Sequence, residues 1–124
     1  MYPEGNRTMK ILILEDNTER MVIFREKLEE EHELHFYDQV EDAKKALSVL
    51  GPFDMIYLDH DLDGRVFVDP EEPNTGYQLA RYIAEHDIGA EIILHTMNPF
   101  GAARMKKVLP RAQRVSFDDL FGIW

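Results

Sequence analysis

Short apolar runs alternate with amphipathic segments along most of this 124-residue chain. Five runs are rich in Ile, Leu, Val and aromatic residues, and the nearly continuous ones are typical of strands buried on both faces. The predicted strands are residues 10–14, 34–37, 53–59, 91–95 and, more weakly, 114–117. The segments between them carry apolar residues three and four positions apart, which predicts helices over residues 17–28, 40–50, 75–85 and 98–109.

This alternation predicts one α/β domain, a doubly wound parallel five-stranded sheet of flavodoxin or receiver type with helices on both faces. Residues 118–124 are too few for a full-length final helix, so we expect a shortened C-terminal helix. The polar residues 1–8 are expected to form a flexible leader before a domain over residues 9–124. Ligands of such sheets bind beyond the carboxyl ends of the strands, so the residues at those ends are the candidates for chemistry.

Composition and charge narrow the function classes. The chain has 24 acidic and 14 basic residues, a formal charge of −10, and no cysteine. The lack of cysteine excludes disulfides, a thiol nucleophile and cysteine-ligated metal sites. The acid excess argues against binding of duplex DNA, which needs a basic face. No apolar run approaches the ~18–20 residues of a membrane span, so we expect a cytoplasmic protein that does not use a membrane.

Acidic side chains stand at two predicted strand ends. Glu15 and Asp16 follow the first strand, and Asp59 ends the third. Crowded carboxylates raise each other's pKa unless a cation joins them, and a hard cation takes oxygen ligands while keeping waters for a substrate. Glu15, Asp16 and Asp59 therefore predict a Mg²⁺ or Mn²⁺ site. The alternative for Asp16 is that it caps the following helix, as Asn17 can.

Two histidines and a further aspartate stand close to this site in the predicted sheet. His95 ends an apolar strand, where a titratable ring destabilises the core unless it is paired, and its ordinary pKa of ~6.5 suits acid–base work. Asp61 can orient that ring. We therefore predict Asp59, Asp61 and His95 as catalytic residues. His60, between the two aspartates, either binds substrate or packs under a neighbouring helix.

Two predicted helix starts can bind a phosphate. Asn98 followed by Pro99 reads as an N-cap and a first-turn proline. The free amides of that helix, with Gly101 allowing close approach, form an anion site. Thr75 opens the preceding helix in the same manner. We predict that Asn98 and Thr75 contact phosphate oxygens.

The arrangement of acidic pair, central aspartate and fourth-strand threonine resembles the receiver domain of response regulators over residues 9–117. The resemblance implies that Asp59 matches the phospho-acceptor aspartate, that Glu15 and Asp16 match the metal-binding acidic pair, and that Thr96 contacts the phosphoryl group. Receivers carry a lysine at the end of the fifth strand, but here Ser116 is closest to that position. The loop after Asp59 is also longer than in an ordinary receiver.

A set of linked motifs is similar to a narrower family, the cyclic-phosphate-processing receiver domains. LDHDL stands at residues 58–62, TGY at residues 75–77 and HTMNP at residues 95–99, in the order that this family has. Several motifs in order are more specific than any single one. Membership implies a role on cyclic or terminal phosphates of nucleotides or RNA ends.

The expected function is thus metal-dependent hydrolysis or binding of a small phosphate ester, a nucleotide or an RNA end. Metal can stabilise charge on the phosphate and activate a water, or Asp59 can attack and form an aspartyl-phosphate. Two alternatives stay open. One is an atypical response-regulator receiver phosphorylated on Asp59, and the other is a non-enzymatic binding module in which His95 and Asp61 have no catalytic role.

Overall fold

The computed structural model describes residues 8–121, in which five parallel strands form one sheet in the order β2-β1-β3-β4-β5. The elements are β1 (Lys10–Leu14), α1 (Thr18–Leu28), β2 (Glu33–Tyr37), α2 (Val40–Val49), β3 (Met55–Leu58), α3 (Gly76–Glu85), β4 (Glu91–Leu94), α4 (Pro99–Val108), β5 (Gln113–Arg114) and α5 (Phe117–Leu120). The doubly wound α/β fold with a shortened last helix is confirmed. The predicted leader lies, apart from Thr8, outside the described residues.

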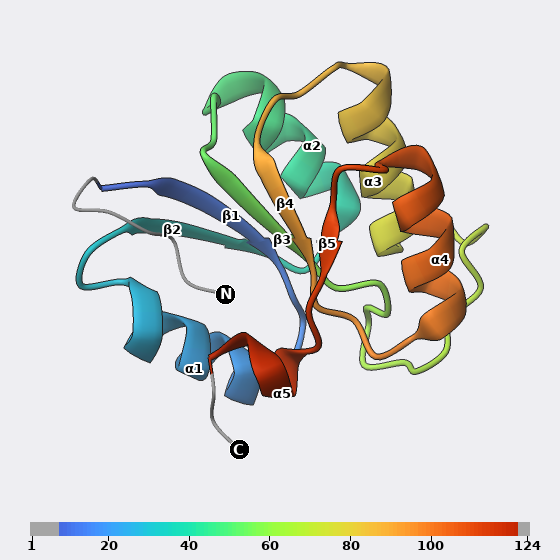
Figure 1. The fold of residues 1–124 in the computed structure, drawn as a ribbon, viewed down its shortest axis with the longest axis horizontal. Helices are drawn as coiled ribbons and strands as arrows, with labels where there is room; N and C mark the ends of the chain where they lie inside the picture. The colour runs from blue at the N-terminus through green and yellow to red at the C-terminus, as the bar shows by residue number, and fades with distance from the viewer. Residues whose placement is uncertain (1–7, 122–124) are drawn as a thin grey trace.

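Helices cover both faces of the sheet (Figure 1). Successive strand residues point to opposite faces, so Ile11 and Ile13 pack toward α1 and α5, while Leu12 and Leu14 pack toward α2, α3 and α4. β3 is buried at every residue, and β1 and β4 are buried at all but their first residue, which explains their nearly continuous apolar sequences.

The fifth strand differs from its prediction. It ends at Arg114, although the amide of Val115 still donates to the carbonyl of Leu94 at 3.0 Å. Phe117 was predicted to lie in this strand, but it begins α5 and packs edge-on against Phe24 of α1, with ring centres 5.7 Å apart. The prediction of a strand at Phe117 is wrong, because this residue is buried between two helices on one face of the sheet and not within the sheet.

The chain runs from β3 to α3 through residues 59–75, which form no helix or strand. This loop lies beside the start of α4 at the carboxyl edge of the sheet (Figure 1). Gly76 lets α3 begin directly against the end of β3, because a Cβ there would collide with the backbone of Asp59. Among residues 8–121, no helix has the length and apolar character needed to cross a membrane.

Candidate active site at the carboxyl edge of the sheet

Three side chains from the ends of three neighbouring strands meet below the carboxyl edge. Glu15 follows β1, Asp59 follows β3 and His95 follows β4, and all three are buried. One ligand atom of each lies within 4.8 Å of the other two. The parallel order β1-β3-β4 brings together residues that are far apart along the chain. The sequence predicted a site at this edge but gave His95 a different partner.

His95 is held by Glu15 and not by Asp61, so the predicted orienting role of Asp61 is wrong. The Nε2 of His95 lies 2.9 Å from Oε1 of Glu15. The other Glu15 oxygen accepts hydrogen bonds from two backbone amides of the following turn, at 3.1 and 3.0 Å. The imidazole also packs edge-on against Phe24, with ring centres 5.4 Å apart. An acidic partner and an aromatic neighbour therefore fix the orientation of His95.

Burial and these neighbours shift the pKa values of the two buried carboxyl groups, Glu15 and Asp59, in opposite directions. Burial alone raises the pKa of Glu15, but its interactions with His95, with the Asn17 amide and with Arg20 together outweigh burial, so the pKa lies below its ordinary value. Burial raises the pKa of Asp59 to about 7, and the charge of Glu15 adds to the rise. Asp59 can therefore hold or release a proton near neutral pH, as a general acid or base must.

Arg20, in the first turn of α1, is a cation at this site that the sequence analysis did not single out. Its Nη1 lies 3.7 Å from Oε1 of Glu15 and 3.6 Å from Oδ2 of Asp59. The guanidinium also lies over the ring of Phe117, 5.4 Å from the ring centre. Both polar distances are longer than a hydrogen bond. Within residues 8–121, the N–H donors of this guanidinium are therefore left for a ligand.

Asp59 and Arg20 face a cavity of about 470 Å³, here called the edge cavity. Asp59 and Arg20 line it, and so do Asp16, Thr96 and residues of the loop 59–75. Glu15 and His95 are fully buried and do not line it. The volume falls in the range of about 300–1,000 Å³ that is common for small-molecule sites. The cavity therefore presents three carboxylates (Asp16, Asp59 and Asp61) and two arginines (Arg20 and Arg65) to a bound molecule, and the buried Glu15–His95 pair lies behind Asp59.

The acidic residues at the carboxyl edge of the sheet, together with His95, fit a divalent cation. The sequence predicted Glu15, Asp16 and Asp59 as ligands, and the structure groups Glu15 and Asp59 with His95. The Asp16 carboxylate accepts a hydrogen bond from the amide of Gly64 at 2.6 Å and lines the same cavity. Carboxylate oxygens suit Mg²⁺ and Mn²⁺, whereas an imidazole nitrogen shifts the preference toward transition metals. The buried carboxylates of this set are compatible with Mn²⁺ as well as with Mg²⁺.

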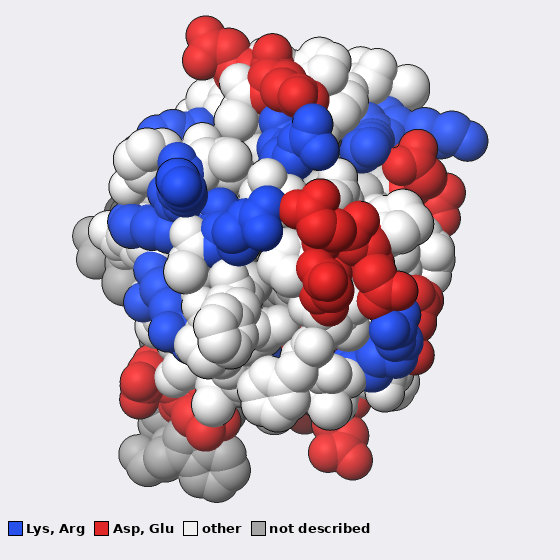
Figure 2. Space-filling view, turned by 90° about the vertical axis from the view of Figure 1, so that its right-hand side faces the viewer, with Lys and Arg blue, Asp and Glu red and all other residues white. Residues whose placement is uncertain are grey.

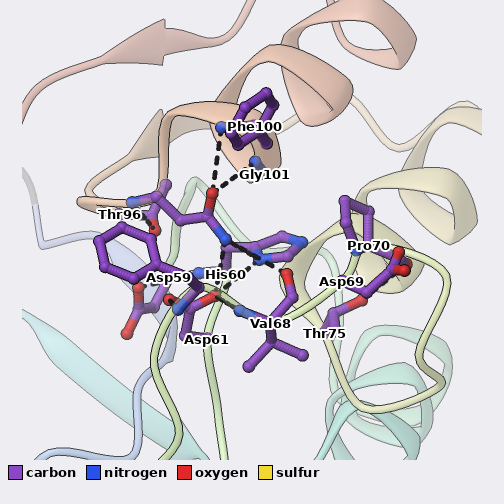
Figure 3. Close-up of polar contacts among 12 residues, drawn as sticks. Asp59, His60, Asp61, Val68, Asp69, Pro70, Thr75, Thr96, Phe100 and Gly101 are labelled. Carbon is purple, nitrogen blue, oxygen red and sulfur yellow. Dashed lines mark hydrogen bonds and ion pairs between the residues drawn. The ribbon is translucent and has the colours of Figure 1, made fainter.

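Asp61 anchors the loop 59–75. Its carboxylate accepts hydrogen bonds from the amides of Phe67 and Val68 at 2.6 and 3.0 Å and from the side chain of Asn98 at 2.9 Å. The Nδ1 of His60 lies 2.9 Å from the same carboxylate (Figure 3). Burial acts to raise the pKa of Asp61, but these hydrogen bonds lower it below its ordinary value. Asp61 is thus held as a carboxylate, which fits positioning of the loop better than proton donation.

His60 packs under α4 because residue 101 is glycine. The imidazole is fully buried, and a Cβ at Gly101 would collide with it. Figure 3 shows the His60 ring below the start of α4, where Gly101 lies. The prediction that Gly101 lets an anion approach closely is wrong, because the His60 ring fills this space. Of the two interpretations of His60, the structure favours the packed one.

Asn98 caps α4 as predicted. Its side-chain oxygen accepts hydrogen bonds from the amides of Phe100 and Gly101, both at 3.0 Å. Its side-chain nitrogen donates to Asp61 and, at 3.2 Å, to the carbonyl of Val68. Asn98 therefore joins the start of α4 to the loop 59–75, and its polar atoms are engaged within the protein.

The two predicted phosphate-binding threonines lie in different surroundings. Thr75 is buried, and its hydroxyl donates to the carbonyls of Pro70 and Glu72 at 3.2 and 3.0 Å. It does not line the edge cavity, so the structure does not bring it to the site. Thr96 does line the cavity, next to Asp59, and its hydroxyl accepts a hydrogen bond from the amide of Asn98 at 3.0 Å.

The family model for the cyclic-phosphate processing receiver domain matches residues 10–111. The chain belongs to this family. The matched range runs from the start of β1 to the turn that precedes β5, and it contains every residue that lines the edge cavity. No curated protein sequence matches this receiver domain.

Solved receiver domains share the fold. A CheY-like receiver domain from Methanospirillum hungatei superposes with a TM-score of 0.70 at 17% identity, covering 93% of this chain and 89% of that one. The response regulator TrrA from Thermotoga maritima, in complex with Mg²⁺-BeF, gives a TM-score of 0.65 at 23% identity, with 90% of each chain covered. At these identities the likeness establishes the receiver fold alone.

The basic residue beside the acidic site comes from a different element than the lysine of ordinary receivers. Ser116 stands nearest the position of the receiver lysine, and its hydroxyl donates to Asp119 at 3.0 Å. Arg20 reaches the acidic site from α1 instead. A signal for it exists in the sequence, because a basic residue in the first turn of a helix opposes the helix dipole and needs an acidic partner nearby. Only the fold shows that the partners are Glu15 and Asp59.

Proposed function

We propose that this receiver domain processes small phosphate esters with the help of a divalent cation, and that its substrates are cyclic or terminal phosphates of nucleotides or RNA ends. The observation that carries the proposal is the pairing of Arg20 with Asp59 at the edge cavity. A titratable carboxyl and an arginine with available donors face one space of ligand size. The family to which the chain belongs supports the choice of a cyclic phosphate.

The charges around the edge cavity favour a phosphate rather than a cationic ligand once a metal is present. A divalent cation on Glu15 and Asp59 would cancel the charge of both carboxylates and release Arg20 from them. A guanidinium then offers parallel N–H donors, which match two oxygens of a phosphate. The acidic composition of the whole chain thereby limits the substrate to a small or terminal phosphate.

In hydrolysis of a cyclic ester, an oxygen of water bonds to phosphorus, the bond from phosphorus to one ring oxygen breaks, and a proton reaches the leaving oxygen. Asp59 lines the cavity, so its carboxylate could take the proton of the water or attack phosphorus itself. Arg20 would bind a non-bridging oxygen and stabilise the charge that develops there. Thr96 lines the same cavity and can orient the phosphate.

Glu15 and Asp59, with His95 or Asp16, would hold the cation, which supplies charge stabilisation and lowers the pKa of water. His95 lies behind Glu15 and acts by fixing the position and ionisation of that carboxylate. Asp61 positions the loop that lines the cavity. Asp59 and Asp61 of the predicted catalytic set both line the cavity, but the hydrogen bonds of Asp61 engage it with the loop and Asn98, which leaves Asp59 to act on the substrate.

A second candidate function is phosphorylation of Asp59 in an atypical receiver. Asp59 and Thr96 line one cavity at adjacent strand ends, as the resemblance to receivers implies. Incubation with acetyl phosphate and Mg²⁺ tests it. Stable, hydroxylamine-sensitive phosphate on Asp59, without ester hydrolysis, would establish this second candidate in place of the first.

The deciding experiment is a panel of 2′,3′-cyclic nucleotides and ADP-ribose 1″,2″-cyclic phosphate, incubated with Mg²⁺ or Mn²⁺ and followed by ³¹P NMR. We expect turnover of at least one ester that disappears in Asp59→Asn. The matched control is Asp87→Asn, the same chemical change at an exposed carboxylate between α3 and β4. The absence of any Asp59-dependent turnover would refute the enzymatic function.

A further inference from the structure

An exposed apolar surface adjoins the edge cavity on the face that carries α4 and the loop 59–75. Four large apolar side chains are more than half exposed there, namely Val66, Phe67, Met97 and Phe100. Figure 2 shows an uncharged area in the lower middle of this face, below bands of acidic and basic side chains. A folded domain rarely exposes several large apolar residues side by side without a ligand for them.

Phe67 is the residue of this surface that touches both spaces. It lines the edge cavity together with Asp59, and it also lines a neighbouring cavity of about 490 Å³, here called the side cavity. Phe100 and Pro70 line the side cavity as well. A molecule with its phosphate at Asp59 would therefore place its next chemical group against the ring of Phe67.

The backbone holds Phe67 in an unfavourable conformation. Its φ of 52° lies in the left-handed region, where a bulky residue other than glycine is uncommon. The amide of Phe67 donates to the Asp61 carboxylate at 2.6 Å, and the next amide donates to the same group. The anchored loop thus keeps an aromatic ring 71% exposed at the mouth of the site. Strain of this kind is concentrated at functional positions.

We propose that the ring of Phe67 stacks on the base of a nucleotide whose phosphate occupies the edge cavity, with Phe100 and Pro70 forming the apolar wall of the side cavity. The inference rests on the proposed function and deepens it, because it restricts the substrate to esters that carry a nucleobase. Every base has an aromatic face, so stacking binds all four bases. The polar atoms of Asn98 at the side cavity are engaged within the protein, which leaves them unsuited to reading a base edge.

The test compares two five-membered cyclic esters that differ in the base. 2′,3′-cyclic AMP carries one and glycerol 1,2-cyclic phosphate does not. Dissociation constants are measured by calorimetry with Mn²⁺ for the intact chain and for Phe67→Ala, Phe67→Leu and Phe67→Trp. We expect Phe67→Ala to weaken the binding of 2′,3′-cyclic AMP by about tenfold or more and to leave the binding of the glycerol ester unchanged. Phe67→Trp should retain the affinity, and Phe67→Leu should lose most of it.

The control variant is Val49→Ala, which truncates an equally exposed apolar side chain on α2. Circular dichroism of each variant checks that the fold is retained. If Phe67→Ala weakens the binding of both esters equally, or of neither, the stacking is overturned and the proposed function is left intact. If the intact chain binds neither ester, the proposed function and the stacking both fail. Equal affinity of the intact chain for the two esters would also overturn the stacking alone.

Discussion

Arg20 places a guanidinium nitrogen 3.6 Å from a carboxylate oxygen of Asp59, although the two residues lie 39 positions apart on α1 and at the end of β3. The same nitrogen lies 3.7 Å from Glu15. The receiver fold thus provides a cation from the first turn of α1, whereas ordinary receivers use a lysine at the end of β5. A metal held by Glu15 and Asp59 would share these carboxylates with Arg20, so the binding of metal would be coupled to the position of the guanidinium.

Replacing Arg20 by Gln should have opposite effects on metal and on phosphate. Without the guanidinium, Glu15 and Asp59 attract a cation more strongly, and we expect Mn²⁺ to bind about five- to tenfold more tightly, as a partly exposed ion pair of about 1 kcal/mol implies. Inorganic phosphate should bind the Mn²⁺-loaded protein more weakly by a similar factor. Both constants are measured by calorimetry. Both constants of Arg20→Lys should lie between those of the parent and of Arg20→Gln. Arg25→Gln, on the same helix, should change neither constant.

Replacing Asp59 by Asn should stabilise the metal-free protein, increasingly so toward neutral pH. Burial raises the pKa of Asp59 from 3.8 to about 7, so ionising it destabilises the folded state. This cost is absent below pH 3.8, grows up to about pH 7 and is constant above. We expect a gain of about 2 kcal/mol at pH 8 and a smaller one at pH 5. Urea unfolding at both pH values, with EDTA, measures the difference, and a gain that is the same at both would contradict the raised pKa.

Replacing His95 by Ala should destabilise the fold strongly, because it leaves Glu15 buried without its partner. Removing the hydrogen-bond partner of a buried charged group costs about 3–5 kcal/mol. The double variant Glu15→Gln, His95→Ala should recover part of that loss. Urea unfolding of the two single variants and the double variant gives the coupling. His86→Ala, at an exposed histidine at the end of α3, should stay within about 0.5 kcal/mol of the parent, and additive losses at Glu15 and His95 would argue against the pair.

Replacing Gly101 by Ala should destabilise the protein although alanine favours helices. The added methyl group collides with the ring of His60, and overpacking of this kind costs about 1–3 kcal/mol. In a His60→Ala background the same Gly101→Ala change should no longer destabilise the protein, because the space that the ring occupied is then free. The double variant should therefore be at least as stable as His60→Ala alone. Gly89→Ala is the matched control, since a Cβ there meets nothing within 4 Å. Thermal unfolding measures all four proteins, and a stabilising Gly101→Ala would refute the packing of His60.

Local pattern in the sequence determined much of the fold and part of the site. The buried runs around Ile11 and Ile92 fix strands that are covered on both faces, and alternation with amphipathic segments dictates a parallel sheet. The parallel sheet in turn brings Glu15, Asp59 and His95 to one edge. The Asn98–Pro99 pair likewise predicts the start of α4, because capping depends on neighbouring residues only.

Tertiary structure alone decided which side chains at that edge become partners. His95 pairs with Glu15 rather than Asp61, Gly101 makes room for His60, and Arg20 reaches the carboxylates from another layer. Apart from Arg20 with Glu15, each of these contacts joins residues at least 39 positions apart in the sequence. Their geometry depends on how the helices pack against the sheet. Sequence periodicity specifies which face of an element is buried, but the distances between side chains of different elements arise only when the elements pack.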